Sequence, residues 1–233
     1  GGPGGPDLAA ARVLSPRTWM FTTPGVASRL TGLAASKALA SGPQKVARDS
    51  YPPAFADAPS GVDVYELDEP VLDLPSLLCA LAEPVRDRLL VAEQAALQWR
   101  RLPAGGSDVS AHERLNVTIH THAGSSTLSP RALVCAAGGG NEALLNQLGL
   151  SAQIRMQRRP LHMVLARGAS LTPLFAHCVS LSDKPRATIT SASDAGGRPV
   201  WYIGGQLAET GVDRSRDEQI AAAKAELAKI VPW

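Results

Sequence analysis

The last third of the chain carries four strand-like segments in succession, and this pattern limits the possible folds more than any other feature. The segments are residues 161–166, 174–181, 186–193 and 199–207. No helix-length segment separates them, and Asp194-Ala195-Gly196-Gly197 between the last two is typical of a hairpin turn. We therefore expect a mostly antiparallel sheet, not the parallel sheet that alternating strands and helices would build.

A long amphipathic helix is predicted directly after these strands, over about 216–230. Ser215 and Glu218 have the spacing of a capping box at its start. Its apolar positions recur at helical spacing, at Ile220, Ala223, Leu227 and Ile230. A helix of this kind buries its apolar stripe against the sheet, so the expected fold class is α+β (mixed α/β).

Composition sets aside several classes of protein. The 233 residues are 45% hydrophobic and 19% charged, which is ordinary for a globular chain. A formal net charge of +2 gives no strong field, so we expect neither nucleic acid nor membrane as a partner. No apolar run reaches the length of a membrane span, and Cys79, Cys135 and Cys178 lie singly in apolar runs. These features favour a cytoplasmic location, and the oligomeric state stays unknown.

Three regions follow one another along the chain. Residues 1–72 are an irregular Gly/Pro-rich lead-in with short elements, among them a helix over 27–39 and an extended segment over 61–71. Residues 73–150 begin with a helix that Asp73 caps and Pro84 interrupts, and strands are expected over 89–99 and 116–122 on either side of a polar loop. Residues 151–233 hold the antiparallel strands and the final helix.

The strongest local signal for a binding site is an apolar run, three glycines and a helix. Residues 132–136 are continuously apolar and predict a strand buried on both faces. Gly138, Gly139 and Gly140 follow, and then a helix over 141–148 that ends at Gly149. Glycines let a cofactor approach the backbone, and the free amides at a helix start favour an anion. A tight turn without a ligand explains the same pattern equally well.

A nicotinamide-binding domain is an alternative, since Gly138, Gly140 and Ala143 fit a dinucleotide fingerprint. That fingerprint expects an acidic residue about 20 positions later, yet none lies between Glu142 and Asp183. The cluster Arg155, Arg158 and Arg159 could hold the extra phosphate of NADP. Pro160 and the antiparallel pattern after it weigh against this reading.

The histidines offer candidates for chemistry but no metal site. His120 and His122 share a strand face and lack a third ligand nearby, so a solvated face is expected and no metal. His162 and His177 each lie in an apolar strand, where a hydrogen-bonded core histidine competes with a catalytic or substrate-binding role. Arg158 and Arg159 lie close to His162 in sequence. Hydrolase and kinase motifs do not occur in the sequence.

The segment Ala132-Leu133-Val134-Cys135-Ala136-Ala137-Gly138 resembles the strand and A-x-G loop of FAD-dependent oxidoreductases in the D-amino-acid oxidase and glycerol-3-phosphate dehydrogenase superfamily. Residues 156–164, 185–191 and 200–209 are similar to the substrate-side sheet of such proteins. The resemblance implies part of an FAD-binding Rossmann-like domain joined to an antiparallel-sheet substrate domain. It covers roughly residues 60–233.

The resemblance also implies a reaction, in which a hydride passes from a carbon next to an amine or hydroxyl to the flavin. Five residues are expected beside FAD: Ala136, Ala137, Gly138, Gly139 and Gly140. An arginine is a natural anchor for a substrate carboxylate or phosphate. His162 and Arg158 are the expected catalytic residues, and Arg159, Arg186 and Tyr202 the expected substrate-binding residues. Trp201 and Tyr202 alternate on a strand, so only one of them can face the site.

Two parts of that superfamily have no counterpart in this sequence, the N-terminal βαβ unit with its G-x-G-x-x-G and the C-terminal FAD segment. We therefore expect a fragment that lacks both ends, binds FAD poorly and is inactive alone. A non-enzymatic α+β interaction domain is the competing interpretation.

Overall fold

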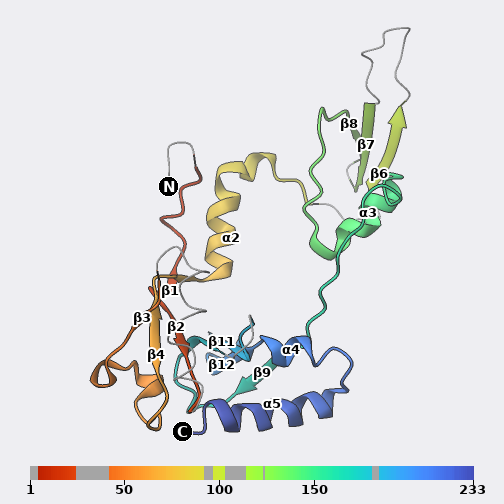
Figure 1. The fold of residues 1–233 in the computed structure, drawn as a ribbon. Helices are drawn as coiled ribbons and strands as arrows, with labels where there is room; N and C mark the ends of the chain where they lie inside the picture. The colour runs from red at the N-terminus through yellow and green to blue at the C-terminus, as the bar shows by residue number, and fades with distance from the viewer. Residues whose placement is uncertain (1–4, 25–41, 92–96, 103–113, 123, 180–183) are drawn as a thin grey trace. The chain divides into compact units, whose positions relative to one another are not determined.

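The computed structural model describes residues 5–24, 42–91, 97–102, 114–122, 124–179 and 184–233 (Figure 1). Contacts divide the chain into two compact units. Unit 1 combines Gly1–Pro84 with Pro160–Trp233, and unit 2 is Val85–Arg159.

Unit 1 contains a seven-stranded mixed sheet in the order β3-β4-β2-β10-β11-β12-β9. The strands are β3 (Gln44–Lys45), β4 (Val64–Leu67), β2 (Thr18–Phe21), β10 (Phe175–Cys178), β11 (Ala187–Ser193), β12 (Pro199–Ile203) and β9 (Val164–Arg167). Only β2 and β10 pair in parallel; the other neighbours are antiparallel. The predicted antiparallel block is therefore confirmed, because β10, β11, β12 and β9 are adjacent in that order.

The hairpin between β11 and β12 forms at the predicted turn. The Asp194 amide donates to the carbonyl of Arg198 at 2.9 Å, and Gly197 adopts a φ of 75°. The Asp194 carboxylate accepts from the amides of Arg198 and Gly196 at 3.0 and 2.9 Å. Hydrogen bonds from the Arg198 amide, which are the largest contribution, hold the pKa of Asp194 below its usual value.

The predicted strand 199–207 ends early, because the chain turns at Gly205. This residue has a φ of 77°, and a Cβ there would lie 2.9 Å from both the Cα of Ala187 and the carbonyl oxygen of Pro185. Only glycine combines that backbone conformation with such close packing. The chain then forms the short helix α4 (Gln206–Glu209) in place of the last strand residues.

The final helix α5 (Arg216–Ile230) matches its prediction, including the capping box between Ser215 and Glu218. Ala223 and Ile230 are buried, whereas Leu227 is half-buried against the same core. The core continues into an aromatic cluster of Phe21, Phe55 and Trp233, with ring centroids 5.1 to 6.5 Å apart. One face of the sheet is thus covered by α5, by the segment around Phe55 and by Trp233 at the end of the chain.

The lead-in contributes more structure than its composition indicates, since β2, β3 and β4 come from it. It also supplies β1 (Val13–Ser15), which pairs with β5 (Val71–Leu72), and two 3-10 turns, η1 (Arg48–Ser50) and η2 (Pro53–Phe55). The predicted helix over 27–39 lies outside the described residues.

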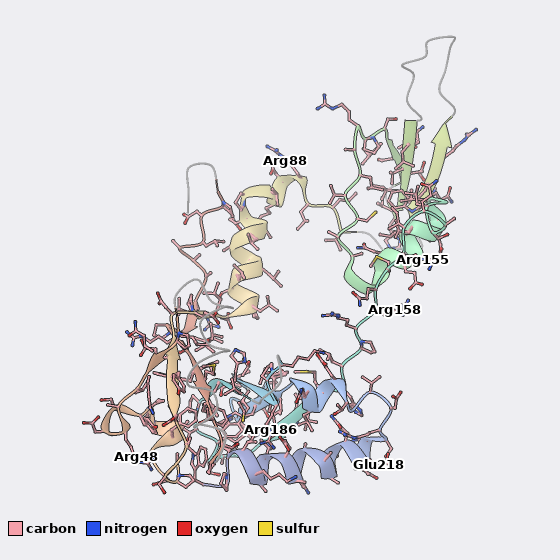
Figure 2. The ribbon with its side chains drawn as sticks, in the orientation of Figure 1. Arg48, Arg88, Arg155, Arg158, Arg186 and Glu218 are labelled. Carbon is pink, nitrogen blue, oxygen red and sulfur yellow. The ribbon has the colours of Figure 1, made fainter. Side chains whose placement is uncertain are left out.

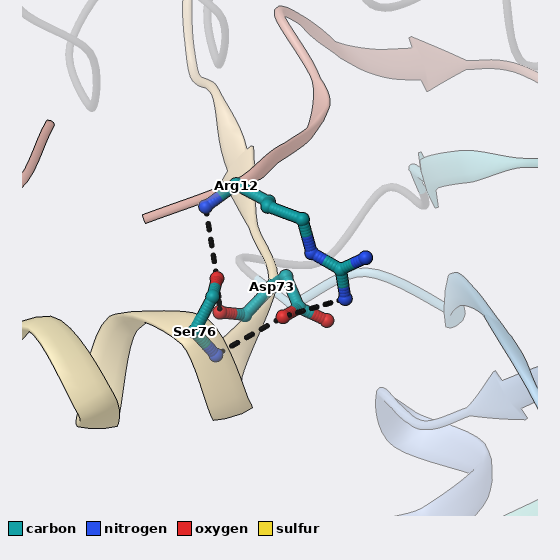
Figure 3. Close-up of polar contacts among 3 residues, drawn as sticks. All are labelled: Arg12, Asp73 and Ser76. Carbon is teal, nitrogen blue, oxygen red and sulfur yellow. Dashed lines mark hydrogen bonds and ion pairs between the residues drawn. The ribbon is translucent and has the colours of Figure 1, made fainter. Parts of the chain in front are cut away.

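Helix α2 (Leu74–Ala82) begins at Asp73, as predicted. The Asp73 carboxylate accepts from the Ser76 amide and forms an ion pair with Arg12, both at 3.0 Å, and the Arg12 amide donates to the Ser76 hydroxyl at 2.8 Å (Figure 3). The Arg12 contact, followed by the Ser76 amide, lowers the pKa of Asp73. At Pro84 the helix gives way to a 3-10 segment, η3 (Glu83–Arg88).

Unit 2 contains a three-stranded antiparallel sheet, β6 (Leu97–Leu102), β7 (Arg114–Thr121) and β8 (Gly124–Leu128). The first two strands were predicted in part, β8 was not, and most of the predicted polar loop lies outside the described residues. The 3-10 turn η5 (Gly138–Gly140) leads into α3 (Asn141–Gln147), as expected.

The buried strand predicted over 132–136 is wrong. These residues have no strand partner among the described parts of the chain, and the side chain of Val134 is 85% exposed. Continuous apolar character predicts burial in a sheet only where neighbouring strands exist to pair with it.

None of the described helices is long and apolar enough to cross a bilayer.

Candidate functional site

The face of the seven-stranded sheet opposite α5 carries an ordered set of side chains, which we call the open face. Because side chains alternate along a strand, every second residue of each strand lies on this face. Direct pairing of Tyr65 with Met20, Met20 with His177, and His177 with Thr188 defines a first row. The row continues to Gly204, whose amide donates to the Thr188 carbonyl at 2.9 Å. Met163 closes it, 3.1 Å from where a Gly204 Cβ would be.

A second row lies two residues farther along the strands. It consists of Leu67, Thr18, Phe175, Thr190, Tyr202 and Leu165. Leu67 and Thr18 are buried, whereas Thr190, Tyr202 and Leu165 are exposed. The open face is therefore most accessible over β11, β12 and β9. It combines the imidazole of His177 and the hydroxyls of Thr188, Thr190 and Tyr202 with apolar side chains.

His177 is at the centre of this face, on the fourth of the seven strands. Its Nδ1 atom is buried and has no hydrogen-bond partner within the described residues. Burial lowers the pKa of His177, and the nearby Glu69 carboxylate opposes this only in part. The imidazole is therefore neutral near pH 7 and offers one donor and one acceptor. Sequence reasoning considered His177 but did not place it among the expected site residues.

Tyr202 lies on the open face, and its neighbour Trp201 lies on the covered face. The Trp201 ring packs against the core and its Nε1 donates to the Thr172 carbonyl at 2.9 Å. The predicted alternation of these two aromatic residues is confirmed, whereas the substrate-binding role of Tyr202 stays a prediction.

His162 makes several contacts within unit 1. Its amide donates to the Ala208 carbonyl at 3.0 Å, and its Nδ1 lies 2.9 Å from the Gly211 carbonyl oxygen. Its own carbonyl accepts from Gln219 Nε2 at 2.8 Å. These contacts fix the start of β9 to the α4–α5 connection. They hold His162 in place, and none of them joins it to Tyr202.

Gln219 is a structural residue that sequence reasoning missed. It is 1% exposed, its Nε2 also donates to the Leu207 carbonyl at 3.1 Å, and its Oε1 accepts from Arg214 at 2.9 Å. A polar residue on the buried side of a helix gives no apolar signal, so periodicity could not identify it.

Arg186 lies at a cavity of about 440 Å³ that is also lined by residues of α4 and α5. Its guanidinium contacts Glu226 of α5, with Nε and NH2 2.9 and 2.8 Å from Oε1, and both side chains are mostly buried (Figure 2). Arg214 and Lys229 line the same cavity. Arg186 is thus bound to the helix that covers the other face, and the structure does not bring it together with Tyr202.

In unit 2, the side chain of Asn141 organises the glycine loop. Its Oδ1 accepts from the Ala137 amide at 2.8 Å, and its Nδ2 donates to the Cys135 carbonyl at 3.1 Å. Gly138 adopts a φ of 53°, which explains a glycine there. At Gly139 an added Cβ would meet no atom within 4 Å. Asn141 was not singled out from the sequence, although asparagine often bonds to nearby backbone in this way.

The basic cluster near the end of unit 2 is exposed. Arg158, labelled in Figure 2, forms an ion pair with Glu142 of α3, with a distance of 2.7 Å from Nε to Oε2. Arg155 and Arg159 are exposed. Across the described residues, no group of three or more His, Cys, Asp or Glu side chains could hold a metal ion.

No protein-family model matches the chain. Over 228 residues the chain is 40% identical to the probable FAD-dependent oxidoreductase PA4991 of Pseudomonas aeruginosa. This chain is a homologue of that protein. The match covers 97% of the chain and 54% of PA4991, so the chain spans about half the length of the relative.

The crystal structure of PA4991 agrees with this relationship. It matches 97% of the chain and 53% of the solved chain, with a TM-score of 0.69 and 33% identity. The mixed α/β architecture of the chain thus corresponds to part of a solved FAD-dependent oxidoreductase. The resemblance to FAD-dependent oxidoreductases is confirmed as homology.

Proposed function

We propose that this chain is part of an FAD-dependent oxidoreductase that oxidises a small amine- or hydroxyl-bearing substrate by hydride transfer to flavin. The observation that carries the proposal is the 40% identity to a probable FAD-dependent oxidoreductase over almost the whole chain. Within unit 1, the open face is the proposed substrate side. Within unit 2, the residues proposed beside FAD are Ala136, Ala137 and the three glycines that follow.

The glycine loop fits an approaching cofactor. Ala136, Ala137 and Gly138–Gly140 are exposed, and packing inside the chain gives no reason for the glycine at 139. The amides of Ala137 and Gly140 donate to Asn141 Oδ1 and to the Ala137 carbonyl. The amides of Gly138 and Gly139 begin the helical segment and can donate to an anionic group. Asn141 holds the preceding backbone in place through two hydrogen bonds. Bound FAD would accept the hydride, which is chemistry that the protein's side chains cannot supply.

The protein's own contribution is to bind and orient the substrate. Tyr202, Thr190 and His177 present polar groups on the open face, and Met20 and Leu165 supply apolar contacts beside them. The catalytic roles of His162 and Arg158, and the substrate-binding roles of Arg159 and Arg186, stay predictions. Arg186 and Arg158 already contact carboxylates of the chain, so each would have to exchange that contact for a substrate anion.

The alternatives receive less support. NADP binding through Arg155, Arg158 and Arg159 would need a sheet that continues in parallel after the loop, yet the four strands that follow are antiparallel to one another. A non-enzymatic interaction domain would be favoured if the full-length protein lacked any flavin-binding segment. The weak binding of FAD expected for the 233 residues alone stays a prediction, which fluorescence titration with FAD tests.

Substitution of Gly139 by Val in the complete protein tests the proposed cofactor loop. The chain itself has room for this side chain, so folding should be unaffected, whereas a cofactor against the backbone would be displaced. Loss of one or two donors to a charged group costs about 1.5 to 3 kcal/mol each, which corresponds to at least about tenfold weaker binding. We expect the purified variant to have lost most of its flavin absorbance.

Gly42→Val is the matched control, since a Cβ at Gly42 also meets no atom within 4 Å and the residue lies in unit 1. It should retain the flavin of the unsubstituted protein. A Gly139→Val variant with a full complement of FAD would contradict the assignment of the loop.

A further inference from the structure

The unpartnered nitrogen of His177 is the feature of unit 1 that its own packing leaves unexplained. Buried polar atoms nearly always have a hydrogen-bond partner, and the exceptions often mark functional sites. The other histidine of unit 1, the half-buried His162, has a partner, because its Nδ1 is 2.9 Å from the Gly211 carbonyl oxygen. At His177 the described residues provide no such group.

The surroundings of His177 favour a small ligand with a polar end. Met20 and Thr188 lie directly opposite it on the two neighbouring strands, at a separation that brings side chains into contact. Thr188 adds a hydroxyl, and a Cβ at Gly204 would lie 2.7 Å from that hydroxyl oxygen. Glycine at 204 therefore leaves the Thr188 hydroxyl room on this face. Two methionines of the row, Met20 beside His177 and Met163 at its end, adapt readily to aliphatic groups.

The Glu69 carboxylate is the charged group that acts on His177. The Thr18 hydroxyl donates to the Glu69 carbonyl at 3.0 Å, which fixes this residue next to the strand that carries Met20. Its charge only partly offsets the effect of burial on the imidazole. His177 thus keeps a free lone pair, and its ring can turn about the soft terminal torsion to present either nitrogen.

We infer that His177 is a positioning residue, which hydrogen-bonds the hydroxyl or amine group of a small aliphatic substrate on the open face beside Thr188. This inference rests on the proposed function and names the substrate group that the face recognises. A hydroxyl carries both a hydrogen and a lone pair, so it matches a neutral imidazole and a threonine hydroxyl together. An aliphatic amine is protonated near pH 7, and its N–H groups can donate to the imidazole lone pair and to the threonine hydroxyl oxygen. A carboxylate has only acceptors, so it could accept from the single N–H of the ring but could not donate to the lone pair of the other nitrogen.

Nitrogen NMR of the ¹⁵N-histidine-labelled chain tests this inference without FAD. The probes are isopropanol, isopropylamine and isobutyrate, which place a hydroxyl, an amine or a carboxylate on a similar aliphatic skeleton. We expect the His177 resonances to move on addition of isopropanol or isopropylamine in the millimolar range, and not with isobutyrate. The His162 resonances should stay unchanged. His177→Phe should remove the responding signals and so assign them.

A second variant separates recognition from packing. Asn places an amide near the position of Nδ1, so in His177→Asn the amide signals of the open face should still respond to the hydroxyl or amine probe, whereas in His177→Phe they should not. His177 resonances that ignore both probes, or that respond equally to isobutyrate, would overturn the inference. Absence of flavin from the purified complete protein would instead contradict the proposed function and leave the NMR result standing, so the two failures are distinguishable.

Discussion

Unit 1 and unit 2 differ in the size of the core that their apolar residues form, although both also expose apolar side chains. The main core cluster belongs wholly to unit 1 and joins residues from both ends of the chain, such as Phe21, Phe55 and Ile230, all of which are at most 1% exposed. In unit 2, Val117, Ile119, Leu145 and Leu148 are buried. Yet its exposed apolar side chains include Leu133, Val134, Ile154 and Met156.

The difference shows which residues are explained by contacts within their own unit and which have no such explanation. In unit 1, Gly205 and Gln219 are explained by contacts inside the chain, whereas the buried nitrogen of His177 is not. In unit 2, an apolar segment and a glycine at 139 have no such explanation. Exposed apolar surface of this kind commonly marks a binding site or an interface. We therefore expect substitutions of matched type to destabilise unit 1 and to affect ligand binding in unit 2.

The largest effect is expected from Gly205→Ala. The left-handed backbone costs about 1 to 2 kcal/mol for an alanine, and a Cβ at 2.9 Å from two backbone atoms adds an overpacking cost of about 1 to 3 kcal/mol. Urea denaturation should show a free energy of unfolding lower by about 3 kcal/mol. Gly139→Ala in unit 2, where the Cβ has open space, should leave stability within about 0.5 kcal/mol. Equal losses of unfolding free energy in the two variants would contradict the proposed difference between the units.

The next effect concerns the buried amide of Gln219. Gln219→Ala leaves the carbonyls of His162 and Leu207 without their donor, and a buried unsatisfied group costs about 1 to 3 kcal/mol. We expect about 2 kcal/mol of destabilisation by urea denaturation. The matched control is Gln147→Ala at the exposed end of α3 in unit 2, which should change stability little. If the Gln219→Ala variant kept the full free energy of unfolding, the hydrogen bonds around His162 would be dispensable for stability.

Sequence patterns predicted unit 1 better than unit 2, for physical reasons. The helix at 216–230 and the turn at Asp194–Gly197 depend on local signals, namely a capping box and glycines with positive φ. The parallel pairing of β2 with β10 joins residues far apart in the sequence, and no local signal specifies it. The apolar run 132–136 failed as a strand because pairing depends on partners that composition cannot reveal. For the candidate site, Tyr202 was placed on a strand correctly, whereas the central position of His177 required the register.

His177 should make the free energy of unfolding of unit 1 depend on pH. Burial lowers its pKa in the folded state below the unfolded value of about 6.5. The unfolded chain therefore binds a proton first as the pH falls, so stability decreases below about pH 6.5 until the folded-state pKa is also passed. Thermal unfolding of His177→Phe should show less loss of stability on acidification than the unsubstituted chain. Identical pH profiles for the two would contradict a buried neutral imidazole.

The smallest effect concerns the rates at which cysteine thiols react, which compares a buried cysteine of unit 1 with a half-buried cysteine of unit 2. Burial raises the pKa of Cys178 in unit 1 to about 12, so at pH 8 almost no thiolate is present there. Cys135 in unit 2 is only half-buried, and Cys79 on α2 is exposed. With a thiol-reactive dye we expect Cys79 and Cys135 to react first and Cys178 to react only on unfolding. Early labelling of Cys178 would show that the core of unit 1 opens readily.

Hydrogen exchange of the complete protein, compared with and without FAD, tests the central claim most directly. We expect FAD to slow exchange of the amides of Gly138 and Gly139 more than those of any other described loop, because these first amides of the helical segment would then donate to the cofactor, whereas the amides of Ala137 and Gly140 already donate within the loop. The core strands β10 and β11 should exchange slowly in both states. Binding of FAD that leaves residues 137–140 unprotected would contradict the assignment of the glycine loop as the cofactor site.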